Sequence, residues 1–256
     1  MPVWHPDLDY LRQSIASVQA QTLSDWELIV VEDPPLSARS LIEGFRDPRI
    51  VHLQRNSKTS LADALNDGLK VCRADLVARL DGDDVCLPER LSRQAAYLNG
   101  HPSISVVGTS LVIINANGKE IGHRAMPCSP AEVRKAMRRY NALAHPSVMF
   151  RKAAVITAGG YENVPAEDYD LWCRLIRDGE QLANLPEALV RYRFHEGALK
   201  FEAVRQAIRD TIDTKRRYFH GQWTLRDRLR LAAERLLLLL PPRAVLALFR
   251  RLVYGA

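Results

Sequence analysis

The sequence has no long apolar run. No segment approaches the ~20 consecutive apolar residues that span a bilayer. Residues 1–5, MPVWH, have neither the basic nor the apolar region of a signal peptide. We therefore expect a cytoplasmic protein. The four cysteines lie far apart, which excludes a disulfide framework and a zinc site of clustered thiols; they are Cys72, Cys86, Cys128 and Cys173.

Basic residues are in excess only near the C-terminus. The formal net charge is +6 over 256 residues. Residues 201–256 hold 12 Lys and Arg against 5 Asp and Glu, whereas residues 1–200 hold 24 against 25. The excess therefore belongs to a terminal segment, which argues against nucleic acid as a partner. We expect one domain over residues 1–200 and a basic helical tail over residues 201–256.

Three carboxylates crowd the end of an apolar run. Residues 76–80, LVARL, lead directly into Asp81–Asp84, sequence DGDD. Such clustering is unfavourable unless a cation neutralises it. A hard divalent metal prefers oxygen ligands and often bridges protein carboxylates to a substrate phosphate. A calcium loop fits less well, because it would need glycine at position 86 and glutamate at position 92, where the chain has Cys86 and Ser92.

Apolar spacing alternates between the periods of helices and strands. Helices are predicted at 8–20, 36–45 and 60–72 and after Pro88, and strands at 26–31, 49–53, 76–80, 104–107 and 111–114. This alternation predicts an α/β domain with a mainly parallel sheet. Ligands of such sheets bind beyond the carboxyl ends of the strands, where Asp33 and Asp81–Asp84 both fall. The alternative is that acidic residues are simply common in turns.

A second acidic centre lies in residues 159–177, where a helix is predicted to begin near Ala166. Asp168 shares one helical face with apolar residues, while Arg174 and Arg177 should point elsewhere. A partly buried carboxylate is a candidate general base. Equally, it could complement the helix dipole from the first turn. His145 and His195 flank this region; a lone histidine is more often structural or solvated.

Taken together, these segments resemble the family 2 inverting glycosyltransferases, which have the GT-A fold, a Rossmann-like mixed sheet flanked by helices. The resemblance extends over nearly all of residues 2–195. The subgroup that it indicates builds bacterial surface polysaccharides and lipid-linked glycans. The matching segments are Pro2-Val3, 14–18, 26–31, Ala64-Leu65-Asn66, 78–84, Pro88-Glu89-Arg90-Leu91, 145–151, Gly159-Gly160-Tyr161, 167–172 and Tyr192-Arg193.

The resemblance implies a donor site and a metal site. It implies a nucleotide-sugar donor, linked to UDP, GDP or dTDP. It assigns donor binding to Pro2, Val3, Asp33, Arg79 and Asp81. It implies Mg²⁺ or Mn²⁺ at Asp83, Asp84 and His195, stabilising the diphosphate leaving group.

The resemblance also implies a catalytic base and an acceptor side. Asp168 matches the base and Glu167 its partner, while His145 and Trp172 fall on the acceptor side. The implied activity is transfer of a sugar to a hydroxyl of a glycan or lipid-linked acceptor with inversion.

The sequence departs from the family pattern at the nucleotide side. The first strand, which in the family precedes Pro2-Val3, is expected to be largely missing, and His5 replaces a usual asparagine. The second acidic turn reads Glu32-Asp33-Pro34-Pro35, in which two prolines remove donors. These changes favour one rival interpretation, a degenerate non-catalytic scaffold; the acidic motifs oppose it. A sugar nucleotidyltransferase is another rival, but residues 1–20 contain no glycine for its phosphate loop.

The tail combines leucines with arginines. Residues 201–220 should continue as a polar helix, and Pro241-Pro242 should divide residues 222–256 into two short amphipathic helices. One hypothesis places them on an anionic membrane surface, at the inner face of the cell membrane. The alternative is a helical hairpin that packs on the domain or on a second copy of the chain.

Overall fold

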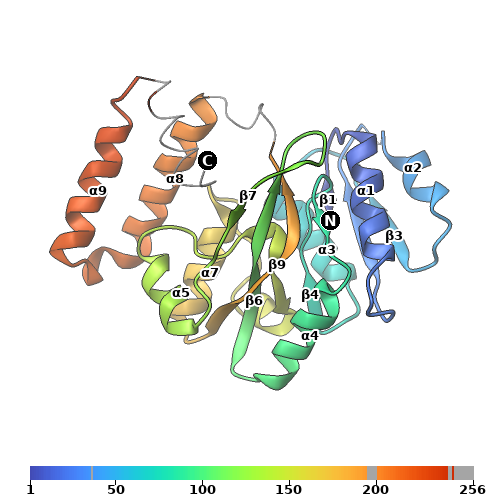
Figure 1. Ribbon diagram of the computed structural model, residues 1–256, viewed down its shortest axis with the longest axis horizontal. Helices are drawn as coiled ribbons and strands as arrows, with labels where there is room; N and C mark the ends of the chain where they lie inside the picture. The colour runs from blue at the N-terminus through green and yellow to red at the C-terminus, as the bar shows by residue number, and fades with distance from the viewer. Residues whose placement is uncertain (36, 195–200, 242–243, 245–256) are drawn as a thin grey trace.

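The structure, a computed structural model, describes residues 1–35, 37–194, 201–241 and 244. Its strands form two sheets, one of three strands in the order β1-β2-β3 and one of six in the order β4-β8-β6-β9-β5, with β7 paired to β6. Helices flank both sheets, and the C-terminal helices α8 and α9 stand to one side (Figure 1). This arrangement confirms the predicted α/β class with a mixed sheet.

The first sheet is entirely parallel and lies between helices. Its elements are β1 (Pro2–Val3), α1 (Leu8–Gln19), β2 (Leu28–Glu32), α2 (Arg39–Gly44), β3 (Ile50–Gln54) and α3 (Leu61–Val71). Every residue of β2 is buried, as expected for a parallel strand covered on both faces. Leu28 and Val30 pack in the cluster that includes α1, whereas Ile29 and Val31 pack against Ala64 of α3.

The second sheet is mixed and mostly antiparallel. Its strands are β4 (Leu76–Ala78), β5 (Val85–Cys86), β6 (Ile104–Ile114), β7 (Glu120–Arg124), β8 (Met149–Arg151) and β9 (Gln181–Arg193). Among the described strands of this sheet, β6 and β9 alone run parallel, so the expectation of a mainly parallel arrangement holds only for the first sheet. The strands predicted at 104–107 and 111–114 are one strand, because residues 108–110 remain extended and buried.

The largest core lies beneath helix α7. The remaining helices of the domain are α4 (Arg90–Gly100), α5 (Pro130–Met137), the short 3-10 helix η1 (His145–Ser147), α6 (Lys152–Thr157) and α7 (Glu167–Arg177). Leu171, Trp172 and Leu175 of α7 are buried with Val106 and Phe150 of the sheet. This packing fixes the first turn of α7, which carries Glu167 and Asp168.

An apolar pocket of about 430 Å³ is lined by residues of both sheets. Its walls include residues of β2, α3 and β4. Beside it, β1 has two residues and pairs with Val31 and Glu32. The amino group of Met1 donates to Ile29 O at 2.9 Å, and burial is the main cause that lowers its pKa to about 5.

The tail begins as a helical hairpin against the domain. It consists of α8 (Phe201–Phe219), the 3-10 turn η3 (His220–Gln222) and α9 (Leu225–Leu237). Phe219 lies in the main core, with Trp223 packed against it. Apart from residue 244, the helix predicted after Pro242 lies outside the described residues. No helix in the described part of the chain is both long and apolar enough to cross a membrane.

Candidate active site

The Asp81–Asp84 turn follows β4 at the edge where the two sheets meet. The Oγ atom of Ser14 on α1 donates to the carbonyl oxygen of Asp81 at 3.0 Å. Gly82 favours close packing here, because a Cβ atom would lie 3.0 Å from the side chain of Val3 and 3.4 Å from Leu11, and these side chains would have to shift. The glycine therefore lets β1, α1 and the acidic turn pack closely, which spaces Asp81 and Asp83 along one short turn.

The three carboxylates of this turn form a compact, negatively charged group. One oxygen each of Asp81, Asp83 and Asp84 lies within 4.8 Å of the others. Asp84 is fully buried; its Oδ1 accepts from Arg193 N at 2.7 Å, while its buried Oδ2 has no hydrogen-bond partner. Burial raises the pKa of Asp84 well above its ordinary value, and repulsion from Asp81 and Asp83 raises it further. An unpartnered oxygen in an all-carboxylate group fits a hard divalent cation.

Arg193 at the end of β9 fixes this turn. Its Nε donates to Asp83 O and its Nη2 to Gln13 Oε1, both at 2.9 Å, and its guanidinium lies 4.1 Å from the ring centre of Tyr10. The Tyr192-Arg193 motif is thus structural support for the acidic turn. His195, the predicted third metal ligand, falls outside the described residues.

Arg79 carries a buried positive charge beside the acidic turn. It forms an ion pair with Asp81, and its carbonyl oxygen accepts from Arg90 Nη2 at 2.7 Å. Burial is the largest single cause and opposes its charged form, but Asp81, Tyr161 and Asp84 together outweigh burial, so the pKa of Arg79 is raised. Its charge also acts on Glu167 and Asp168, holding down the pKa of each carboxyl group. Arg79 therefore connects the acidic turn with a second cluster.

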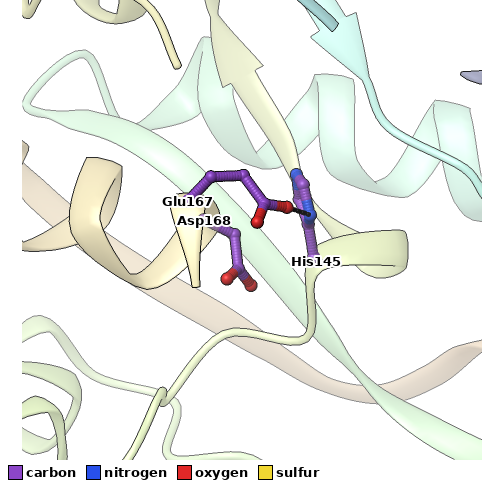
Figure 2. A group of neighbouring side chains, drawn as sticks. All are labelled: His145, Glu167 and Asp168. Atoms are coloured by element: carbon purple, nitrogen blue, oxygen red, sulfur yellow. Dashed lines mark ion pairs between the residues drawn. The ribbon is translucent and has the colours of Figure 1, made fainter. Parts of the chain in front are cut away.

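That second cluster consists of His145, Glu167 and Asp168 (Figure 2). The Glu167 carboxylate points towards the imidazole, with Oε1 3.8 Å from His145 Nδ1, and His145 Nε2 lies 3.0 Å from the Tyr161 hydroxyl. Burial lowers the pKa of His145 well below its ordinary value, and Arg79 lowers it further. Burial first, and then Asp168, raises the pKa of Glu167 to about 7.

Asp168 is held by one neutral donor on each oxygen. Asn141 Nδ2 donates to Oδ2 and Tyr169 N donates to Oδ1, both at 2.7 Å. Burial raises the pKa of Asp168, although both donors and Arg79 oppose that rise. The carboxylate also lies in the first turn of α7, where the helix dipole favours negative charge. Thus the two interpretations of Asp168 from sequence, general base and dipole partner, are compatible.

Two sequence motifs meet behind this cluster. Asn66 Nδ2 donates to Tyr161 O at 2.8 Å, and Tyr161 N donates to Asn66 Oδ1 at 2.9 Å. Gly160 has φ 73°, and a Cβ atom there would lie 2.7 Å from Asn66 Oδ1. The Ala-Leu-Asn and Gly-Gly-Tyr motifs therefore position Tyr161 and, through it, His145. Sequence reasoning assigned no role to either motif, although their presence in the family pattern was a signal.

Two predictions for α7 need correction. The Trp172 side chain is fully buried, and its ring centre lies 6.0 Å from that of His145. It therefore supports the histidine from the core instead of facing an acceptor. Arg174 was expected to point away, but it is buried against Asp170 with an Nε–Oδ2 distance of 2.8 Å. Apolar spacing did not predict this burial, because Arg174 is buried as an ion pair with Asp170.

Asp33 follows β2 and lies beside β1. Its amide donates to Val3 O at 3.1 Å, so Val3 links Asp33 to Gly82 and the acidic turn. Arg55 pairs with Asp33 Oδ1 and with Asp67 Oδ2, both at 3.0 Å. Sequence reasoning missed Arg55. Of the predicted donor residues, Pro2 and Val3 form β1, Val3 lies against Asp33 and Gly82, and Arg79 pairs with Asp81.

Comparison with known proteins identifies the family. The model of the family described as glycosyl transferase family 2 matches residues 1–157. The chain belongs to the family 2 glycosyltransferases. The amylovoran biosynthesis glycosyltransferase AmsE of Erwinia amylovora is 37% identical over 189 residues, which are 72% of this chain and 70% of AmsE. The O-antigen biosynthesis glycosyltransferase WbnJ of Escherichia coli is 33% identical over 201 residues, 76% of this chain and 78% of WbnJ.

Solved structures show the same fold at low sequence identity. S. aureus TarS 1–349 in complex with UDP-GlcNAc has a TM-score of 0.63 and 15% identity, covering 95% of this glycosyltransferase and 82% of that chain. The mannosyltransferase PcManGT of Pyrobaculum calidifontis, in complex with GDP-Man and Mn²⁺, has a TM-score of 0.63 and 14% identity. The match covers 96% of this chain and 70% of that chain. The predicted family, GT-A fold and enzyme class are confirmed.

Proposed function

We propose that this glycosyltransferase moves a sugar from a nucleoside-diphosphate donor to a hydroxyl of a glycan or lipid-linked acceptor, with inversion at the anomeric carbon. The observation that carries the proposal is the pair of acidic clusters on either side of Arg79. The Asp81–Asp84 turn is short of positive charge, whereas Asp168 is desolvated and held by neutral donors. The first arrangement suits a cation and a diphosphate; the second suits a base.

Asp83, with Asp81 and Asp84, would hold Mg²⁺ or Mn²⁺, and His195 is the further ligand that the family resemblance implies. When bound, the ion stabilises the negative charge that develops on a departing diphosphate. The orphaned Asp84 Oδ2 supports this assignment. Asp33, Pro2 and Val3 would receive the nucleotide and Arg79 the region near the sugar. Complexes of fold neighbours with UDP-GlcNAc and GDP-Man favour such a donor.

Asp168 would take the proton from the acceptor hydroxyl as that oxygen attacks the anomeric carbon. The new C–O bond forms on the face opposite the departing diphosphate, so one displacement inverts the configuration. One base is sufficient, whereas hydrolytic glycosidases use a pair of carboxyl groups. Burial lowers the pKa of His145 and so favours its neutral form beside Glu167, and both would line the acceptor side without adding a cation.

A donor screen tests the proposal. The melting temperature would be measured with Mn²⁺ and UDP-, GDP- or dTDP-linked sugars, in wild type and in Asp83→Asn. One nucleotide class should stabilise wild type in a Mn²⁺-dependent way, and the variant should lose that gain. Absence of a shift with every donor would favour the rival, a non-catalytic scaffold of the same fold.

Helix α9 supports association with an anionic membrane surface, as at the inner face of the cell membrane. Its exposed leucines recur at one helical face, and they are Leu225, Leu229 and Leu236, followed by Leu239. Basic residues Arg226, Arg228 and Arg235 interrupt them, while Leu231 is buried and Glu234 pairs with Lys215 of α8. One face of the hairpin thus packs on the domain, and the opposite face, which carries leucines flanked by arginines, is exposed.

Sedimentation with vesicles tests the membrane role. Wild type should bind vesicles that contain phosphatidylglycerol and bind less well to purely zwitterionic ones. Leu225→Asn with Leu229→Asn should reduce binding, whereas Leu8→Asn on α1, a matched exposed leucine, should not. Equal binding by both variants would contradict the role of α9.

A further inference from the structure

The loop between α5 and η1, residues 138–144, delivers one side chain to the proposed base. Asn141 is half-buried, and its Nδ2 donates to Asp168 Oδ2 at 2.7 Å. Its own Oδ1 accepts from Leu143 N at 3.3 Å, which fixes the orientation of the amide so that its NH₂ group faces the carboxylate. Tyr169 N donates to the other oxygen, so the Asp168 carboxylate is hydrogen-bonded by this loop and by α7.

The same loop is secured from two further elements. The hydroxyl of Tyr169, the residue after Asp168, donates to Met137 O at the start of the loop. Lys215 of α8 is buried, donates to Arg139 O at 2.8 Å and pairs with Glu234 of α9. The position of Asn141 is therefore set by α7 and by the C-terminal hairpin together, and not by the loop alone.

We propose that Asn141 is a positioning residue for Asp168: its amide holds the carboxylate in the rotamer that leaves one lone-pair direction of the base open to the acceptor hydroxyl. This inference rests on the proposed function, because it assumes that Asp168 is the base. A neutral donor suits the task, since a cation in its place would form an ion pair with the base and weaken it as a proton acceptor. In the described part of the chain, the other charged or titratable groups near Asp168 include His145, Glu167, Arg79, Tyr161, Tyr169 and Cys173.

Two variants separate hydrogen bonding from mere packing. Asn141→Ala removes the donor, and Asn141→Asp keeps the shape but replaces the donor with an acceptor. Asn99→Ala, an exposed asparagine on α4, is the control. The titration of the Asp168 carboxyl carbon would be followed by ¹³C NMR, with the resonance assigned through Asp168→Asn. The midpoint should rise in the order wild type, Asn141→Ala, Asn141→Asp, because each step stabilises the ionised carboxylate less.

Turnover with the donor found by the screen gives a second readout. Asn141→Ala should lower kcat by roughly tenfold, as expected when a general base is less well placed. The acidic limb of its pH profile should move upward, and the KM for the donor should stay within about twofold of the wild-type value. An unchanged midpoint and an unchanged kcat in both variants would overturn the inference.

The two proposals fail in different ways. If Asp168→Asn keeps full turnover, the assignment of the base is wrong, whatever Asn141 does. If Asp168→Asn is inactive while both Asn141 variants behave as wild type, the base stands and only the positioning role is lost. If the Asn141 variants raise the KM for the acceptor but leave the Asp168 titration unchanged, Asn141 contacts the acceptor and does not position the base.

Discussion

The Asp81–Asp84 turn and the His145, Glu167 and Asp168 cluster are both acidic, but their surroundings differ. In the turn, three carboxylates repel one another, and one buried oxygen has no partner. In the cluster, as at Asp84, desolvation is the leading cause of the pKa shifts, but here each oxygen of Asp168 accepts a hydrogen bond from a neutral donor. The same residue type therefore serves two chemistries, and the neighbours decide which.

Arg79 makes the two regions interdependent. It forms an ion pair with the first and lowers the carboxyl pKa values of the second. Removing one partner of a buried ion pair leaves the opposite charge buried without compensation. Substitutions in the two clusters should therefore separate binding from turnover, whereas a change at Arg79 should disturb both.

The largest effect is expected for Asp168→Asn. The side-chain amide of this variant cannot take the proton from the acceptor hydroxyl. The value of kcat should therefore fall by about a thousandfold, within the range that general bases contribute. Steady-state release of the nucleoside diphosphate measures this. Asp178→Asn, an exposed carboxylate at the end of the same helix, is the control and should retain turnover.

Arg79→Met should be the most destabilising change. Removing a buried charge leaves Asp81 and the nearby carboxylates without compensation, which costs about 3 kcal/mol of unfolding free energy. Urea denaturation at pH 7 would measure the loss. Arg39→Met breaks an exposed ion pair with Glu43 and should change stability by less than about 0.5 kcal/mol. Equal losses in the two variants would show that Arg79 does not organise the site.

Asp83→Asn should reduce kcat/KM by roughly a hundredfold, because an interaction with developing charge is lost. Raising the Mn²⁺ concentration should recover part of the activity, since the remaining carboxylates still bind the ion weakly. No such recovery is expected for Asp168→Asn. If metal rescues both variants equally, the two clusters do not have separate roles.

Glu167→Gln should have the smallest effect, one that depends on pH. The pKa of Glu167 is raised to about 7 from 4.5, so the folded state disfavours its charge. The contribution of Glu167 to the stability of wild type should therefore fall as the pH rises from 4.5 to 7 and stay constant above pH 7. The variant lacks this titration and should be more stable than wild type by about 1–2 kcal/mol at pH 8 but not at pH 4. Denaturation at the two pH values checks this, and equal differences would contradict the assigned cause.

The sequence predicted the elements that local patterns determine. The helix over 60–72 is found at Leu61–Val71, where Ser60 and Asp63 form a capping box. The acidic turn was predicted because a carboxylate trio after an apolar strand is rare in itself. The helix carrying Asp168 was predicted from its periodicity. Each of these features depends on residues close together in the chain.

Features that depend on distant residues could not be predicted in this way. Asn141 reaches Asp168 across 27 positions, and Arg193 reaches Asp84 across 109. Strand direction in the second sheet was also misjudged, because alternation along the chain does not reveal that β8 inserts between β4 and β6. The family resemblance supplied roles for Asp33 and Asp168, but not their partners Arg55 and Asn141.

Calorimetric titration of the preferred nucleoside diphosphate, in the presence of Mn²⁺, tests the division between the two clusters most directly. Wild type, Asp83→Asn and Asp168→Asn would be compared at pH 7. Asp168→Asn should bind with wild-type affinity while it fails to turn over, and Asp83→Asn should lose most of the Mn²⁺-dependent affinity. Loss of binding in Asp168→Asn to the same extent as in Asp83→Asn would contradict the separation of metal site and base.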